Sequence, residues 1–479
     1  MSNYFVTTSI PYVNGDPHIG YAMELIQADV LARLARLEKK QVIFSIGTDE
    51  HGGKIAEKAI ALKITPKELA DKISLKFSDL ADKLNISYDR FIRTTDADHI
   101  KRAQAIWQLL EKDIYKASYV GWYCTGDEAF FTETEVKTHN GICPNHNRPF
   151  EKIEEENYFF RLSKYGDVIK EAILNKTFNI LPENKSHEIL TLIDSGLDDI
   201  SISRPKDKIN WGIKIPNDNS QVMYVWFEAL MNYITVLGYP DSEEYKSYWP
   251  AKVQVVGKDI LRFHGAIWPA MLLSLGLQLP EKLYVHGFVT LNGLKIGKSL
   301  GNAISPDEII NIYGPDAFRY YFLRHIPSYG DGDFNWSLFE KAYNNELANE
   351  LGNAVQRTIT LFDKYFAEEL ISINIAQHDI AGYTQALSEC RFDRALDVVW
   401  EQVRGLNQYI DETKPWEIAQ SGDMEHLKEV LIYQASNLLE ISILIGPFMP
   451  NTALNMKKIF NLSTKEKFRQ ILFPKLDKK

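Results

Sequence analysis

Two short segments, far apart in the chain, carry the residue types that bind a nucleoside triphosphate. The first reads SIPYVNGDPHIGY over residues 9–21, where a β-type run breaks at Pro11 and an amphipathic helix begins. A helix N-terminus has unpaired backbone N–H groups and a partial positive charge, which favour an anion. His18 lies at that terminus, and Gly20 lets a flat base or a phosphate approach the backbone closely. By itself, His18 is equally typical of a helix cap or a surface histidine.

The second segment reads LKIGKSLGN over residues 294–302. Lys298, and less directly Lys295, can neutralise a leaving pyrophosphate, and Gly297 lets such a loop close. Attack of a carboxylate on the α-phosphate of ATP needs well-placed cations and dipoles, and it needs no covalent nucleophile. The two segments together therefore predict a nucleotide site at the end of a strand, served by a distant mobile lysine loop.

These segments resemble the HIGH and KMSKS motifs of class I aminoacyl-tRNA synthetases. HIGH stands as His18-Ile19-Gly20-Tyr21, and KMSKS stands as Lys295-Ile296-Gly297-Lys298-Ser299. Tyr21 replaces the second histidine; a phenol donates a hydrogen bond but cannot be a cation, so the role of Tyr21 stays open. Both lysines are kept. The resemblance implies an ATP site, used with Mg²⁺, at His18, Gly20, Tyr21, Lys295, Lys298, Ser299, Gly257, Asp259 and His286.

Three further segments narrow the resemblance to the methionyl-tRNA synthetases: SIPYVNG at 9–15, GTDEHG at 47–52 and YVWFEA at 224–229. A polarisable thioether packs well against aromatic rings. The resemblance implies that Asp49 binds the substrate α-ammonium as a charge-assisted pair. It also implies that the Tyr233 hydroxyl and the Ile10 backbone N–H contact the sulfur, and that His264 closes the site. The expected methionine-binding residues are Ile10, Tyr12, Asp49, Trp226, Ala229, Tyr233, Phe263 and His264.

The composition is that of an ordinary globular protein, with 479 residues, 45% hydrophobic and 25% charged. No apolar run reaches membrane-spanning length and the N-terminus has no basic segment followed by an apolar one, so we expect a cytoplasmic protein without a membrane partner. The net charge of −10 argues only weakly against a polyanionic partner, because binding needs a local basic face.

The order of β-rich and helical segments predicts an α/β fold: a Rossmann-like parallel sheet, an inserted domain and a C-terminal helical bundle. We expect strands at 224–233, 253–259 and 284–289, and a helix at 260–275. The expected parts are 1–115 and 223–302 for the two halves of the catalytic domain, 116–222 for an inserted connective domain, 303–340 for a stem-contact linker and 341–479 for an anticodon-binding domain.

The three cysteines are too few, and odd in number, for a disulfide framework. Two of them belong to the knuckles CTGD at 124–127 and CPNH at 143–146. Cys124, Asp127, Cys143 and His146 can form a tetrahedral structural zinc site, in which Asp127 is the poorer ligand. The alternative is a family relic that no longer binds metal.

The resemblance also implies that the helical bundle reads the anticodon of methionine tRNA. Asn353 and Arg357 stand one helical turn apart, and Trp416 follows a proline. Splayed bases are read by stacking and by edge hydrogen bonds, although core packing is the competing interpretation for Trp416. Longer family members carry a C-terminal dimerising extension for which this chain has no room, so we expect a monomer.

The resemblance thus implies a ligase that forms methionyl-adenylate from L-methionine and ATP and transfers it to tRNA. One alternative is a class I synthetase for cysteine, which would hold its thiol substrate with zinc; no cysteine lies near Ile10 or Trp226 in the sequence. Another is a synthetase-like protein that binds tRNA without charging it, which only Tyr21 and Gly297 favour. Methionine-dependent ATP–pyrophosphate exchange separates the three.

Overall fold

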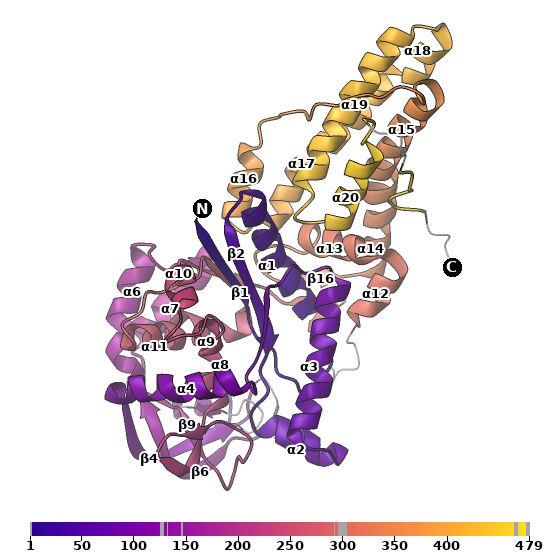
Figure 1. Ribbon diagram of the computed structural model, residues 1–479. Coiled ribbons are helices and arrows are strands. Elements are labelled where there is room, and N and C mark those ends of the chain that lie inside the picture. Colours follow the sequence, from indigo (N-terminus) through magenta and orange to yellow (C-terminus); the bar gives the residue numbers. More distant parts are fainter. Residues whose placement is uncertain are drawn as a thin grey trace. The chain divides into compact units, whose positions relative to one another are not determined.

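The computed structural model describes residues 2–124, 129–131, 133–144, 147–291, 293–295, 304–463 and 468–475. The chain divides into two compact units (Figure 1). Unit 1 comprises Met1–Asp16, Lys40–Asp79 and Tyr88–Val285, and unit 2 comprises Pro17–Lys39, Leu80–Ser87 and His286–Lys479. The five-part division expected from the sequence stays a prediction.

Unit 1 is built on a six-stranded sheet in the order β3-β2-β1-β12-β13-β7. The pairs β3–β2, β2–β1, β1–β12 and β13–β7 are parallel, as alternating β and α segments predict. Its strands are β1 (Asn3–Thr8), β2 (Gln41–Thr48), β3 (Arg90–Arg93), β7 (Asn179–Leu181), β12 (Val253–Gly257) and β13 (Lys282–His286). Because parallel strands end at one edge, the loops after β1, β2 and β12 gather where such sheets bind ligands.

Antiparallel strands follow in the expected insertion, with β4 paired to both β5 and β6. These smaller sheets contain β4 (Ile114–Cys124), β5 (Ala129–Phe131), β6 (Glu151–Phe160), β8 (Ile200–Ser201), β9 (Ser203–Pro205), β10 (Lys214–Ile215) and β11 (Asp218–Met223). The helices are α2 (Gly53–Leu62), α3 (Pro66–Lys83), α4 (Ala97–Leu110), α5 (Glu133–Thr138), α6 (Gly166–Leu174), α7 (Glu183–Asp194), α8 (Val225–Leu230), α9 (Asn232–Thr235), α10 (Glu243–Tyr248) and α11 (Trp268–Ser274).

The strand expected at 224–233 is wrong, because this segment forms α8 and α9. Its valine and aromatic residues favour a strand, but the core overrides that preference. Five of the six residues of α8 are buried, all except Trp226, and Phe227 packs edge-on against Trp107 in the main core. The expected helix at 260–275 is present, with a π-helical turn over Phe263–Ile267 before α11.

The strand expected at 284–289 is interrupted at Gly287, so that β13 ends at His286 and β14 (Val289–Leu291) begins a separate small sheet with β15 (Leu294–Lys295) and β16 (Gly332–Phe334). The backbone of Gly330 passes so close to Gly287 that an added Cβ would lie 1.9 Å from the Gly330 carbonyl oxygen. Only glycine permits that approach.

Unit 2 is mainly helical, as the loss of β signals predicts. Figure 1 shows α15, α17 and α19 running side by side, and these three helices pack against one another. Its helices are α1 (Ile19–Leu37), α12 (Pro306–Tyr313), α13 (Pro315–Arg324), α14 (Trp336–Ala342), a π-type segment (Tyr343–Gly352), α15 (Asn353–Tyr365), α16 (Ala381–Ser388), α17 (Phe392–Thr413), α18 (Pro415–Ser421), α19 (Met424–Leu444) and α20 (Pro450–Ile459). In the part of the chain that the structure describes, no helix has the length and apolarity that a membrane crossing needs.

Candidate active site

The loop after β2 carries Asp49, the expected partner of a substrate amine. Asp49 and Tyr12 form an isolated parallel β-bridge that extends the β1–β2 pairing beyond the strands. The Asp49 amide donates to the Pro11 carbonyl at 2.9 Å, and the Val13 amide donates to the Asp49 carbonyl at 3.1 Å. The Asp49 side chain is buried, with 2% exposed. The structure therefore holds the main chain of Asp49 at the sheet edge, paired with that of Tyr12.

The expected aromatic residues form a cluster around Tyr12. The rings of Tyr12 and Trp226 meet edge-to-face with centroids 5.6 Å apart. Trp226 in turn stacks on Phe263, with centroids 4.4 Å apart and planes inclined by 18°. Residues from the loop after β1, from α8 and from the π-turn thus meet, although they are far apart in sequence. Such a cluster offers the polarisable faces that suit a thioether.

Tyr233 and His264 form a buried hydrogen-bonded pair, and their contacts determine which of the two residues donates. The His264 Nδ1 atom lies 3.0 Å from the Ile260 carbonyl oxygen, which can only accept, so Nδ1 carries the proton. The Nε2 atom then accepts from the Tyr233 hydroxyl at 2.7 Å. Burial lowers the pKa of His264 to about 4, against the opposing effect of the Ile260 bond, so the ring is neutral at physiological pH. The Tyr233 oxygen consequently has lone pairs rather than a proton to offer elsewhere.

Glu228 of α8 is a buried acid that links three elements. Its carboxylate oxygens lie 2.7 Å from His51 Nδ1 and 3.0 Å from His99 Nε2. His99 of α4 also contacts the Thr235 hydroxyl at 2.8 Å. Burial alone would raise the pKa of Glu228, but the two imidazoles outweigh burial and the net direction is downward. The carboxylate is therefore charged, and it fixes α8 to the loop after β2.

The segment around His18 belongs to unit 2. The His18 imidazole caps α1, since its Nδ1 atom accepts from the Gly20 amide at 3.1 Å and from the Tyr21 amide at 3.4 Å. A Cβ at position 20 would lie 3.0 Å from the His18 ring, so a glycine at this position leaves room for the imidazole. Tyr21 is buried, and burial together with the Glu24 carboxylate raises the pKa of its phenol well above the ordinary value. Tyr21 is therefore a neutral hydroxyl.

Three other residues expected at the ATP site, Gly257, Asp259 and His286, lie at or just after the end of a strand. Gly257 ends β12 and Asp259 lies in the short turn that follows. His286 ends β13, and its imidazole contacts Glu24 at 2.9 Å and the Gly287 carbonyl at 2.8 Å. Lys298 and Ser299 lie outside the described residues, and so does the side chain of Lys295.

Of the expected zinc ligands, Cys124 and Cys143 are described, whereas Asp127 and His146 lie outside the described residues. Both cysteines are buried in a small cluster with Val136 and Phe150, and neither forms a disulfide. Within the described ranges, no group of three or more His, Cys, Asp or Glu side chains is arranged to hold a metal ion.

Two of the three expected anticodon residues, Arg357 and Trp416, contact each other. Arg357 of α15 lies over the ring of Trp416, 4.9 Å from its centroid, and donates to Asp411 at 2.9 Å. Trp416 begins α18 and is 37% exposed, so it is a surface residue and not a core residue. Asn353 begins α15, one turn before Arg357.

Several residues around Tyr233 and Tyr224 were not predicted from the sequence. Trp268 is fully buried, with its ring centroid 5.7 Å from that of Tyr233; its spacing of four from His264 in a predicted helix was an available signal. Arg204 lies over the Tyr224 ring at 4.4 Å. It lines a cavity of about 10 Å³ together with Gly52, Ile209, Trp211, Met223, Tyr224 and Val225.

The comparisons with known proteins show the family of this chain. A family model described as "tRNA synthetases class I (M)" matches residues 4–152 and 145–359. The chain is 42% identical to the methionine–tRNA ligase of Caldanaerobacter subterraneus over 99% of this chain and 79% of that protein. It is 40% identical to that of Brucella suis over 98% of this chain and 94% of that protein.

Among solved structures, that of Mycobacterium tuberculosis methionyl-tRNA synthetase in complex with methionyl-adenylate matches with a TM-score of 0.90 and 36% identity, over 96% of this chain and 94% of the other. The parallel sheet, the capped helix at His18 and these matches define a class I aminoacyl-tRNA synthetase. Within that class, the chain belongs to the methionine–tRNA ligase family.

Proposed function

We propose that this member of the methionine–tRNA ligase family forms methionyl-adenylate from L-methionine and ATP and transfers the methionyl group to methionine tRNA. The observation that carries the proposal is the position of Asp49. Asp49 is buried and its backbone pairs with that of Tyr12, whose ring begins the aromatic cluster with Trp226 and Phe263. A carboxylate next to polarisable rings matches an amino acid that has a charged amine and a thioether side chain.

For the methionine half-site, we assign the α-ammonium to Asp49 and the side chain to the aromatic cluster, with Ala229 of α8 at its edge. The Ile10 backbone N–H supplies a donor to the sulfur. The Tyr233 hydroxyl gives its proton to His264, so it approaches the sulfur with its oxygen and its ring rather than with a hydrogen. This assignment keeps the expected contact between Tyr233 and the sulfur and specifies that the Tyr233 oxygen makes it without a proton.

For the ATP half-site, we assign phosphate contacts to His18 and the α1 N-terminus, and pyrophosphate neutralisation to Lys298, with Mg²⁺ bound to ATP. The His18 cap supports this, because it keeps the imidazole at the positive end of α1. Supporting roles in the same half-site fall to Gly20, Tyr21, Gly257, Asp259, His286, Lys295 and Ser299.

For tRNA, we assign anticodon recognition to Asn353, Arg357 and Trp416. The exposed Trp416 ring, already paired with a guanidinium, supports this, because stacking on aromatic and arginine planes is how unstacked bases are bound. We further propose that the chain acts as a monomer. Every described residue assigned to methionine lies in unit 1, so these contacts need no residue of a second subunit.

We also propose a structural zinc ion at Cys124 and Cys143, with Asp127 and His146 as the other ligands. The Asn147 amide donates to the Cys143 carbonyl at 2.9 Å, and the Cys143 amide donates to the Arg148 carbonyl at 2.8 Å, a turn of the kind that can carry a metal-binding thiol. Metal analysis of the purified protein tests this, and a protein free of zinc at full activity would contradict it.

Methionine-dependent ATP–pyrophosphate exchange tests the main assignment. We expect exchange with L-methionine, and we expect Lys298→Ala to lower kcat while methionine binding, followed by calorimetry, is unchanged. Lys63→Ala, a lysine at the end of α2, is the control. Exchange with cysteine instead would favour a cysteine enzyme, and exchange with no amino acid would favour a tRNA-binding protein that charges nothing.

A further inference from the structure

Two adjacent carboxylates, Asp49 and Glu50, follow β2, and the structure gives them different surroundings. Only one of them is needed for a substrate ammonium. Both side chains are buried, with 2% exposed for Asp49 and 0% for Glu50. The contacts of Glu50 show that its charge is already used within the protein.

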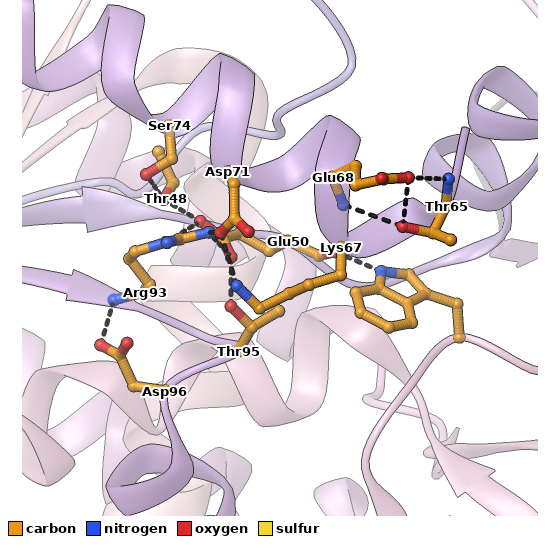
Figure 2. Close-up of polar contacts among 11 residues, drawn as sticks. Thr48, Glu50, Thr65, Lys67, Glu68, Asp71, Ser74, Arg93, Thr95 and Asp96 are labelled. Carbon is orange, nitrogen blue, oxygen red and sulfur yellow. Dashed lines mark hydrogen bonds and ion pairs between the residues drawn. The ribbon is translucent and has the colours of Figure 1, made fainter. Parts of the chain in front are cut away.

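Glu50 accepts four hydrogen bonds, and Figure 2 shows them converging on its carboxylate. Arg93 of β3 donates twice, from Nε at 2.6 Å and from Nη2 at 2.9 Å, which is the bidentate geometry of a strong ion pair. The hydroxyl of Thr48 donates at 2.8 Å, and the hydroxyl of Thr95 completes the set. The carboxylate is therefore saturated and cannot compete with Asp49 for a cation.

The network continues beyond Glu50 on both sides. The Thr48 hydroxyl, having given its proton to Glu50, accepts from Ser74 of α3 at 3.0 Å. Arg93 also donates to Asp71 of α3 at 2.5 Å (Figure 2). Burial opposes the charge on Arg93, but the two carboxylates outweigh it and raise the pKa of the guanidinium. Two elements of unit 1, β3 and α3, thus hold the residue that follows Asp49.

The backbone of Glu50 is fixed as well. Its amide donates to the Thr94 hydroxyl at 2.9 Å, and its carbonyl accepts from the Trp211 indole at 2.5 Å. On its other side, Asp49 has both backbone groups bonded to the segment of Pro11 and Val13. Because the backbone is fixed on both sides of it, Asp49 has little main-chain freedom, and this limits the positions that its carboxylate can take.

We propose that Glu50, through its ion pair with Arg93, is a positioning residue that holds the Asp49 carboxylate in the orientation that takes the α-ammonium of methionine. This proposal rests on the assignment of Asp49 to the substrate amine. The physical reason for its importance is geometric, since a displacement of about 1 Å at a binding group can cost up to 10²-fold in rate. Glu50 itself does not touch the substrate.

The test compares ligands with and without the amine. In Glu50→Gln the side chain keeps its size but loses the ion pair with Arg93. We expect the KM for L-methionine in ATP–pyrophosphate exchange to rise about tenfold, equivalent to ~1.4 kcal/mol. The KM for ATP should change less than about twofold. The inhibition constant of L-methioninol, which keeps the amine, should rise with the KM for methionine, whereas that of 4-(methylsulfanyl)butanoate, which lacks the amine, should stay the same. General damage to the site would weaken both inhibitors alike, and that outcome would overturn the proposal.

Two further variants control for folding. Arg93→Lys keeps the charge but not the two-pronged geometry, and it should give the same selective loss for amine-bearing ligands in a smaller amount. Asp71→Asn still offers Arg93 an acceptor and does not touch the loop, so it should leave the KM for methionine unchanged. If Glu50→Gln does not fold, as judged by its thermal unfolding, Arg93→Lys decides: equal losses for ligands with and without the amine would overturn the proposal.

A double-mutant cycle separates this proposal from the proposed function. In an Asp49→Asn background, Glu50→Gln should have no further effect on the KM for methionine, because the group that it positions is gone. If Asp49→Asn alone leaves that KM unchanged, the assignment of Asp49 fails. If Asp49→Asn raises the KM but the effect of Glu50→Gln simply adds to it, the assignment of Asp49 stands and the positioning role fails.

Discussion

His264 should stay neutral far into the acid range, and a titration from pH 7.5 to pH 5.5 tests this. Its ring is 3% exposed and is held between the Ile260 carbonyl and the Tyr233 hydroxyl. Protonating Nε2 would require the Tyr233 hydroxyl to turn away, and it would place a charge in a buried site. Burial accordingly lowers the pKa of His264 to about 4.

The size of the effect follows from the two pKa values. At pH 5.5, a histidine with a pKa of about 4 is roughly 3% protonated, whereas one at the ordinary value of 6.5 is roughly 90% protonated. The pKa is lower in the folded protein, so the unfolded chain binds more protons between these values. The neutral His264 ring therefore contributes its full share to the free energy of unfolding above about pH 6.5, and this contribution is lost as the pH falls toward 4. The contribution amounts to about 3 kcal/mol.

The assay is nitrogen-15 NMR of protein labelled at histidine. The resonances missing in His264→Gln identify the ring, and we expect the neutral tautomer with the proton on Nδ1 throughout the titration. The same protein unfolded in urea should show the ordinary titration of all its histidines. If His264 is mostly protonated at pH 5.5, Tyr233 does not donate to a neutral imidazole. The assignment in which Tyr233 contacts the sulfur without a proton would then be refuted. In Tyr233→Phe, Nε2 loses its donor, and the ring should protonate at a higher pH than in the wild type.

Three other changes probe the methionine half-site, the anticodon half-site and the fold. Trp226→Ala removes the ring between its two neighbours and should raise the KM for methionine at least tenfold with little change for ATP, measured by exchange. Trp416→Ala should lower kcat/KM for tRNA charging, with a loss of binding free energy of about 1–3 kcal/mol, which is the contribution of one stacked base. The rate of ATP–pyrophosphate exchange should stay unchanged. Arg319→Met should destabilise unit 2 by about 3–5 kcal/mol in urea unfolding, because it removes one of the two guanidiniums that pair with the buried Asp29, the other being that of Arg33, and leaves three backbone carbonyls without their donor.

The parallel sheet and the helical unit could be predicted because their patterns are long and regular. The buried faces of α15, α17 and α19 repeat at helical spacing over many turns. The segment at 224–233 could not be predicted, because Val225, Trp226 and Phe227 favour a strand locally. The core around Trp107 decides its conformation, and the core is made by residues distant in sequence.

The same distinction holds for the site. Asp49, Tyr12 and Trp226 were singled out because their short segments resemble those of the methionyl-tRNA synthetases, and their roles stay predictions. Partners such as Arg93 for Glu50 and His99 for Glu228 could not be predicted, because nothing in their own segments distinguishes them from surface charges. They become partners only when β3 and α4 bring them to the loop after β2 and to α8.

Glu228 is a second such buried carboxylate, and the effect of its replacement on stability and on KM can be measured. It lies two residues after Trp226 on α8, and its carboxylate contacts His51, which lies two residues after Asp49. It therefore ties α8, which carries Trp226, to the loop after β2, which carries Asp49. Glu228→Gln keeps the shape but has only one acceptor for two imidazoles, so we expect about 1–3 kcal/mol of lost stability in urea unfolding. We also expect a raised KM for methionine at an unchanged KM for ATP. A variant with the lost stability but an unaltered KM would show that α8 and the loop after β2 reach their places independently of this contact.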